Sequence, residues 1–206
     1  MKWRASQIGK LMTPARKKSE TLSQTAKSYI REIAKQDFYG YETQLSTRQI
    51  RKGLEYEPES IELLNAVRFT DYKKNTERLS NEYITGEPDI VTNNSIIDIK
   101  TSWSLETFPA TISEGESSLY EWQLRAYMYL FNKPSSELIY CMIDTDDDLL
   151  NDFDNLSIHK VKHIEPAKRI TCLKFEKNTL YEEQMRETLV YCSEYYSKYV
   201  NELNNK

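Results

Sequence analysis

Apolar side chains recur every three to four residues in four stretches of the chain, which is the spacing of one face of an α-helix. The predicted helices run from about 22 to 36, from about 46 to Arg68, from Ser118 to about Phe131, and from about Leu180 to Val200. Ser46 with Gln49 and Ser118 with Glu121 match the capping-box pattern at a helix start. Pro58 is expected to kink the second helix.

Short runs rich in β-forming residues predict the strands. Glu82–Thr92 and Ser95–Trp103 flank two asparagines, which tolerate the positive φ of a tight turn, so these runs are expected to form a hairpin. Two further strands are predicted at Leu138–Ile143 and Arg169–Phe175, and residues 104–117 and 144–154 are expected to be loops. The 206 residues therefore predict one α/β domain over 1–206, with a central mixed β-sheet flanked by helices.

The predicted hairpin brings acidic side chains together. A two-residue turn at 93–94 pairs residues whose numbers sum to 187, which sets Asp89 opposite Asp98. Lys100 shares that face, with Glu87 expected opposite it. The other face carries Ile84, Ile90, Ile97 and Ile99. Facing carboxylates repel each other, so the pattern favours a bound cation, and the alternative is a solvated face with one Glu87–Lys100 ion pair.

A third carboxylate is expected on the second predicted helix. Glu57 falls within the apolar stripe formed by Ile50, Leu54, Ile61 and Leu64. An inward carboxylate is costly unless it is paired or bound to a metal, although an acid at the stripe's edge can also reach solvent. Three carboxylates without histidine or cysteine select Mg²⁺ or Mn²⁺. With Lys100 to position water or neutralise charge, they indicate metal-assisted hydrolysis of phosphate esters.

Charge is distributed unevenly along the chain. The net charge is −4, but residues 1–52 carry twelve basic and four acidic side chains, a net of +8. A basic first quarter suits a surface that follows phosphates, and solvated helix faces give the same count. Three scattered cysteines disfavour a disulfide framework or an iron–sulfur cluster. Without an apolar leader or a membrane-length apolar run, the protein is expected in the cytoplasm, with no membrane partner.

These residues resemble the PD-(D/E)XK nucleases. Pro88-Asp89 and Asp98-Ile99-Lys100 match the core pattern of that superfamily. GLEYEP at residues 53–58 resembles the glycine-to-glutamate element of the phage lambda exonuclease and YqaJ-like branch. Gln123 and Tyr127 resemble the Q-x-x-x-Y element of RecB-type domains, and Ala5-Ser6 is similar to the turn by which the branch contacts DNA.

The resemblance implies a restriction-endonuclease-like core that uses Mg²⁺ or Mn²⁺, with two ions. It implies metal ligands at Glu57, Asp89, Asp98 and the Ile99 backbone carbonyl, with Lys100, Gln123 and Tyr127 completing the catalytic site. The residues expected to bind DNA are Arg4, Ser6, Lys10, Arg16, Lys17, Lys18 and Arg125. In the lambda enzyme, chain upstream of the serine supplies an arginine for the 5′-phosphate. The resemblance does not extend to that stretch, so Arg4 or Arg16 is expected as the substitute.

By the same resemblance, the expected activity is that of a phage recombination exonuclease. Such an enzyme digests linear duplex DNA from an end, leaves single-stranded DNA for an annealing protein, and forms a closed trimeric homo-oligomer. The alternatives are an endonuclease or a single-strand exonuclease on the same fold, or a non-catalytic DNA-binding module. Paired carboxylates argue against the last, because binding DNA does not require them.

Other candidate sites are weaker. The acidic segment 144–155 begins like a calcium loop but lacks its glycine and its bidentate glutamate. His159 and His163 are expected at the surface. Trp103 and Trp122 could stack on bases, and core packing is the expectation for at least one of them.

Overall fold

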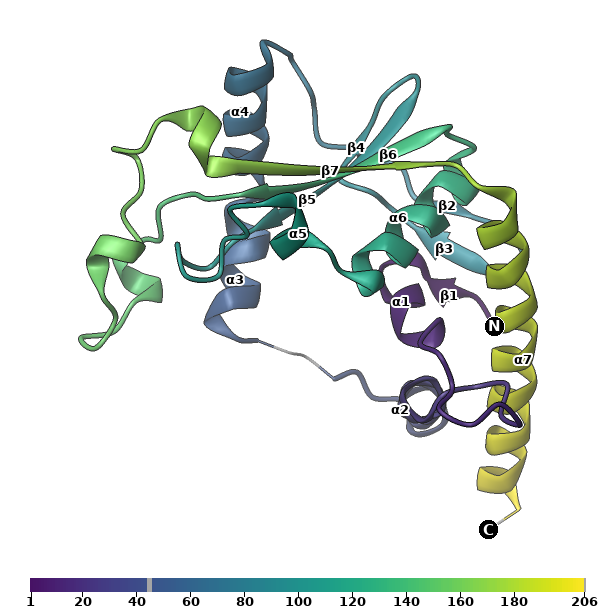
Figure 1. Ribbon diagram of the computed structural model, residues 1–206. Helices are drawn as coiled ribbons and strands as arrows, with labels where there is room; N and C mark the ends of the chain where they lie inside the picture. Colours follow the sequence, from purple (N-terminus) through teal and green to yellow (C-terminus); the bar gives the residue numbers. More distant parts are fainter. Residues whose placement is uncertain (44–45, 206) are drawn as a thin grey trace.

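The computed structural model describes residues 1–43 and 46–205, and a four-stranded mixed sheet lies at its centre (Figure 1). Its strands, in spatial order, are β4 (Ile90–Val91), β5 (Ser95–Thr101), β6 (Ser135–Cys141) and β7 (Ile170–Glu176). The central pair β5 and β6 is parallel, and the outer strands are antiparallel to their neighbours. The predicted α/β fold with a mixed sheet flanked by helices is confirmed.

A smaller sheet divides the first predicted hairpin strand. Its order is β1 (Trp3–Arg4), β3 (Ile84–Gly86) and β2 (Leu79–Ser80). The run Glu82–Thr92 is therefore not one strand: β3 belongs to the small sheet and β4 to the large one. Pro88 lies between them and has no N–H to donate to a ladder. Glu87 consequently does not face Lys100 as predicted, and instead lies 3.2 Å from Arg78.

The predicted hairpin register is correct beyond this break. Ile90 pairs with Ile97 and Val91 with Ile96, both sums being 187, and the Thr92 N–H donates to the Ser95 carbonyl over 2.9 Å. Side chains alternate along β5, so Ile96 and Asp98 share one face of the sheet while Ile97 and Ile99 share the other. This register places Asp89, the residue before β4, opposite Asp98.

Helices cover both faces of the large sheet (Figure 1). On the face of Ile96, the core includes residues of α1 (Ile8–Leu11), α2 (Gln24–Tyr39), α6 (Ser118–Phe131) and α7 (Thr179–Asn204). On the opposite face, Ile90, Ile97 and Ile99 pack with α4 (Glu57–Arg68). Ile84 was expected with these three isoleucines but packs in the first core instead, because β3 belongs to the other sheet.

The predicted second helix is two helices. α3 (Arg48–Glu55) ends before Tyr56, and α4 begins at Glu57. Pro58 lies in the first turn of α4, where a missing N–H costs nothing, so it starts a helix rather than kinking one. The N-cap of α3 is Thr47 and not Ser46, since Thr47 Oγ1 accepts from the Ile50 N–H over 3.2 Å.

The remaining elements are short. They are η1 (Ala5–Gln7), α5 (Ile112–Gly115), η2 (Asp147–Leu149), η3 (Leu156–Ile158) and η4 (Pro166–Arg169). The predicted loop 104–117 thus contains a helix, α5, which has a capping box between Thr111 and Glu114. The capping box predicted at Ser118 is absent, because Ser118 is already the first residue of α6 and its N-cap is Ser117, whose side chain makes no capping hydrogen bond. Glu121 instead pairs with Arg125. Among the described residues, no helix has the length and apolarity needed to cross a bilayer.

Candidate active site

A cleft of about 920 Å³ opens beside β5 and β3. All six side chains predicted to form the catalytic site line it: Glu57, Asp89, Asp98, Lys100, Gln123 and Tyr127. Two of the predicted DNA-binding residues, Arg4 and Ser6, also line it. The chain thus brings together residues from five elements and connecting segments between positions 4 and 127.

Asp98 is the centre of the cleft's polar network and is 2% exposed. Its Oδ1 accepts a hydrogen bond from Gln123 Nε2 over 2.7 Å, and its Oδ2 lies 2.6 Å from Lys100 Nζ. Lys100 also lies over the ring of Tyr120, 4.8 Å from its centroid. Burial lowers the pKa of Lys100, but Asp98 and Asp89 outweigh it and raise that pKa above its usual value, so the side chain is an ammonium ion at neutral pH.

Asp89 is held beside Asp98 by the backbone of β5. Its Oδ2 accepts a hydrogen bond from the Ile99 N–H over 2.6 Å. Burial and the neighbouring Asp98 charge raise the pKa of Asp89 to about 7, although the Ile99 N–H opposes this shift. A carboxylic acid that titrates near neutrality beside a second acid is typical of a site that takes up a cation.

Glu57 is 9% exposed, so its predicted inward position is correct, although the predicted reason is not. Ile50 and Leu54, expected to share a buried stripe with it, are 39% and 71% exposed. Glu57 Oε1 lies 2.8 Å from Lys74 Nζ, and Lys74 was not a sequence candidate. Lys74 comes from an extended segment without periodicity, so no sequence pattern links it to Glu57.

Gln123 and Tyr127 lie one turn apart on α6, as predicted. The Tyr127 hydroxyl donates to the Glu87 carbonyl over 3.3 Å. Its ring lies so close to Gly86 that a Cβ there would be 2.7 Å from Tyr127 Cε1 and 2.8 Å from the Ala5 Cβ. Gly86 thus allows the α6 motif, the Ala5 turn and the small sheet to meet at the cleft.

The carboxylates have the chemistry of a hard-cation site. Glu57 Oε1 and Asp98 Oδ2 are buried, and each lies near an ammonium ion yet accepts no well-directed hydrogen bond. Within residues 1–43 and 46–205, no three His, Cys, Asp or Glu side chains are close enough to enclose a metal. The expected three-carboxylate cage is therefore not assembled in this arrangement, in which Lys74 and Lys100 neutralise two of its acids. The oxygen donors fit Mg²⁺ or Mn²⁺.

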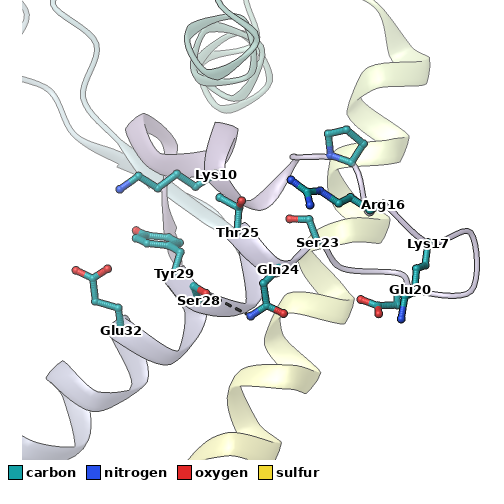
Figure 2. A pocket seen from close by; sticks show the side chains of 11 residues that line it. Lys10, Arg16, Lys17, Glu20, Ser23, Gln24, Thr25, Ser28, Tyr29 and Glu32 are labelled. Carbon is teal, nitrogen blue, oxygen red and sulfur yellow. Dashed lines mark hydrogen bonds between the residues drawn. The ribbon is translucent and has the colours of Figure 1, made fainter.

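The other predicted DNA-binding residues lie outside the cleft. Lys10, Arg16 and Lys17 line a separate pocket of about 730 Å³ between the loop after α1 and the first turns of α2 (Figure 2). Lys18 is exposed on the same loop. Arg125 does not line the cleft. It pairs with Glu121 at 2.6 Å and stacks on Tyr181 of α7, 3.6 Å from the ring centroid, so packing between α6 and α7 accounts for it.

One further prediction needs correction. His159 is 2% exposed and packs edge-on against Trp103, with ring centroids 5.1 Å apart, so it is not a surface residue. Trp103 lines the cleft, and Trp122 packs against Tyr181. Sequence analysis also missed Arg78, a cation of the cleft lining that pairs with Glu87.

The cleft holds two facing aspartates, a lysine two residues beyond the second, and a glutamate from a flanking helix. This is the arrangement expected from the resemblance to the PD-(D/E)XK nucleases. The sequence itself matches no family model and no curated protein. Solved structures are more informative. The phage-related exonuclease from Haemophilus somnus 129PT is 29% identical, with 98% of this chain and 96% of that chain covered and a TM-score of 0.92.

An alkaline exonuclease from Laribacter hongkongensis, LHK-Exo, is 15% identical over 99% of this chain and 92% of that one, with a TM-score of 0.70. Its complex with dAMP gives a TM-score of 0.68. At this identity, the likeness to LHK-Exo shows a shared fold. The predicted resemblance to the PD-(D/E)XK nucleases, in the branch of the phage-related and lambda-type exonucleases, is confirmed by these structural neighbours.

Proposed function

We propose that this protein is a divalent-metal-dependent exonuclease that digests linear duplex DNA from an end and leaves single-stranded DNA. That it is an enzyme of the exonuclease class follows from its kinship with the phage-related exonuclease. The proposal of metal-dependent cleavage rests on one observation, which is that Asp89, Asp98 and Lys100 lie in one cleft. Facing carboxylates destabilise a hairpin unless a cation joins them, and DNA binding alone gives no reason for them.

The roles of the residues follow from their contacts. Glu57, Asp89, Asp98 and the Ile99 carbonyl would hold Mg²⁺ or Mn²⁺, as one or two ions. Such an ion supplies Lewis-acid polarisation of the phosphate and an activated water. Gln123 orients Asp98 through Oδ1. Lys100, an ammonium ion beside Asp98, positions the water or neutralises charge that develops on the phosphate.

The basic first quarter would supply the DNA surface. Arg4 and Ser6 lie in the cleft, where Arg4 is a candidate for contacting a terminal phosphate. Lys10, Arg16 and Lys17 line the separate pocket after α1 and form no ion pair with any described acidic side chain. Unpaired cations attract phosphates through charge and counterion release, without reading sequence.

The resemblance extends this proposal to the assembly. In this extended proposal, one nuclease domain over 1–206 forms a closed trimer in the cytoplasm. A single-strand annealing protein then takes up the product in phage-type recombination. The protein's net charge is −4, so a ring with its basic segments inward would concentrate positive charge where DNA passes. Light scattering of the purified protein measures the assembly.

The test of the function uses end-labelled linear DNA and closed circular DNA, each with Mg²⁺ and with chelator. The expected result is loss of label from linear DNA with Mg²⁺ only, and no cleavage of the circle. Asp98→Ala is expected to abolish cleavage while circular dichroism shows a retained fold. Cleavage in chelator excludes the metal mechanism, and cutting of the circle favours the endonuclease alternative.

A further inference from the structure

Helix α3 forms part of the cleft wall, yet only one of its eight side chains is buried. The α3 residues that line the cleft are Gln49, Ile50, Gly53 and Leu54. A helix at a protein surface ordinarily packs its apolar face on the core. In α3, Ile50 and Leu54 are exposed beside the cleft, and the fully buried side chain is Lys52, which is 0% exposed.

Lys52 uses all three of its ammonium donors. Nζ donates to the Trp103 carbonyl over 3.0 Å, to the Ile143 carbonyl over 2.8 Å and to Thr145 Oγ1 over 2.8 Å. Trp103 lies two residues beyond β5, and Ile143 lies two residues beyond β6. One ammonium ion therefore fastens the cleft wall to the ends of both central strands.

The rest of α3 is attached by polar contacts at its outer side. Arg48 donates to the Leu149 carbonyl over 3.1 Å and pairs with Asp154 at 2.5 Å. Arg51 lies 3.4 Å from Asp148. Since no apolar side chain of α3 is buried, its position depends on these polar contacts. Among the described residues, the fully buried ones are those that Lys52 makes to Ile143 and Thr145.

The surroundings of Lys52 do not neutralise it. Among the described side chains, no carboxylate lies within ion-pair distance of Nζ. Asp144 and Glu59 favour the ammonium ion from a distance, and the ring of His159 packs nearby against Trp103. Burial outweighs the two acids and lowers the pKa of Lys52 to about 8. Burying an ammonium ion costs free energy. What Lys52 provides here, and an apolar side chain could not, is a set of directed hydrogen bonds.

We propose that Lys52 is a positioning residue that sets where α3 lies against the strand ends, and thereby sets the opening of the cleft to DNA. This inference rests on the proposed nuclease function. Asp98, Lys100 and Gln123 come from β5 and α6, and Glu57 begins α4, which has its own buried anchors in Ile61 and Leu64. Loss of Lys52 therefore alters substrate binding more than the chemical step.

The experiment compares Lys52→Met with Leu189→Ala, a destabilising core change on α7, no residue of which lines the cleft. KM and kcat are measured on linear DNA well below both melting temperatures. Lys52→Met is expected to raise KM about fivefold or more with kcat within about twofold, whereas Leu189→Ala keeps the parental KM. Thr145→Val removes one acceptor and is expected to raise KM less, and it serves as the test if Lys52→Met does not fold.

Hydrogen exchange provides a readout that needs no substrate. The amides of 48–55 are expected to exchange faster in Lys52→Met and Thr145→Val but not in Leu189→Ala. A parent protein that cleaves no DNA overturns the proposed function and leaves this comparison to decide the role of Lys52. Unchanged exchange in α3, or a Lys52→Met enzyme whose only defect is lower kcat, overturns the positioning role.

Discussion

Gln123 Nε2 donates a 2.7 Å hydrogen bond to Asp98 Oδ1, while Asp98 Oδ2 lies 2.6 Å from Lys100 Nζ. The two oxygens of one carboxylate are thus assigned to different partners, one from α6 and one from β5. Gln123 is 4% exposed and packs within the body of the protein, so it fixes the orientation of the Asp98 carboxyl plane. Oδ2 is left beside Lys100 without a well-directed hydrogen bond, and it is the oxygen proposed to bind a cation.

Gln123→Leu is therefore expected to lower activity by about 10- to 100-fold, because an outer-shell partner orients the carboxylate that holds the metal. The Mg²⁺ concentration for half-maximal activity should rise as well. Arg125→Gln is the matched control, since it alters a polar side chain of the same helix outside the cleft. Equal losses in both variants would assign the effect to the stability of α6 rather than to Asp98.

Asp89 makes the metal-free protein pH-sensitive. An aspartic acid that titrates near 7 in the folded state and near 4 when unfolded keeps its proton better in the folded protein. Its contribution to stability is thus complete below about pH 4 and is lost as pH rises through 7. In chelator at pH 8, Asp89→Asn is expected to melt at least about 2 °C above the parent, and at pH 4 the two should coincide.

Added Mg²⁺ completes that test. The ion offsets the repulsion between Asp89 and Asp98, so it should raise the melting temperature of the parent at pH 8 and raise that of Asp89→Asn less. A variant that melts below the parent at pH 8 in chelator would show that the acid pair is not strained.

The hairpin could be predicted from the sequence because its constraints are local. The two-residue turn and the two-residue period of a strand fix which side chains face each other, so the Asp89–Asp98 pairing followed from residue numbers. The break between β3 and β4 did not follow, because it depends on β1 pairing with β3 from the far end of the chain.

The wall of the cleft was harder to predict for a physical reason. Periodicity identifies an apolar face but not what that face contacts, and the exposed Ile50 and Leu54 face a cleft rather than the core. Lysine is among the residues least often buried, so sequence analysis counted Lys52 as surface charge. Its three acceptors come from residues 51 to 93 positions away, which no local pattern reveals.

Lys100 is expected to act in the chemical step. Lys100→Met removes the ammonium ion beside Asp98 and should lower kcat by about 100-fold or more, because the charge matters most in the transition state. DNA affinity, measured by anisotropy with Ca²⁺ in place of Mg²⁺, should stay within about threefold of the parent. Loss of affinity with an unchanged kcat would make Lys100 a binding residue.

The basic loop after α1 is expected to determine how DNA affinity depends on salt. Charge reversal of Arg16, Lys17 and Lys18 should flatten the plot of log affinity against log salt by about 0.9 for each duplex phosphate that the loop no longer neutralises. The matched control reverses three exposed lysines outside both pockets, Lys162, Lys174 and Lys198. Equal slopes in the two triple variants would show that the DNA-binding surface does not include this loop.

Glu57 provides a comparison within one helix. Glu57 is 9% exposed and faces the cleft, whereas Glu62 of the same helix is exposed. Glu57→Gln keeps the shape but removes a negative oxygen ligand, so it should shift Mg²⁺ activation to concentrations about tenfold higher and lower the maximal rate. Glu62→Gln, and Glu55→Gln at the end of α3, should match the parent.

A change at Lys74 also tests whether Glu57 is a metal ligand, but here less Mg²⁺ rather than more should be needed. Its Nζ lies 2.8 Å from Glu57 Oε1 and must yield that oxygen when a metal binds there. Lys74→Met removes this competitor, so less Mg²⁺ should be needed for half-maximal activity, provided that Glu57 is intact. The double variant with Glu57→Gln should lose this gain, because the oxygen for which Lys74 competes is then no longer charged. If Glu57→Gln has the same Mg²⁺ curve as Glu62→Gln, Glu57 is not a metal ligand and the site is reduced to Asp89 and Asp98.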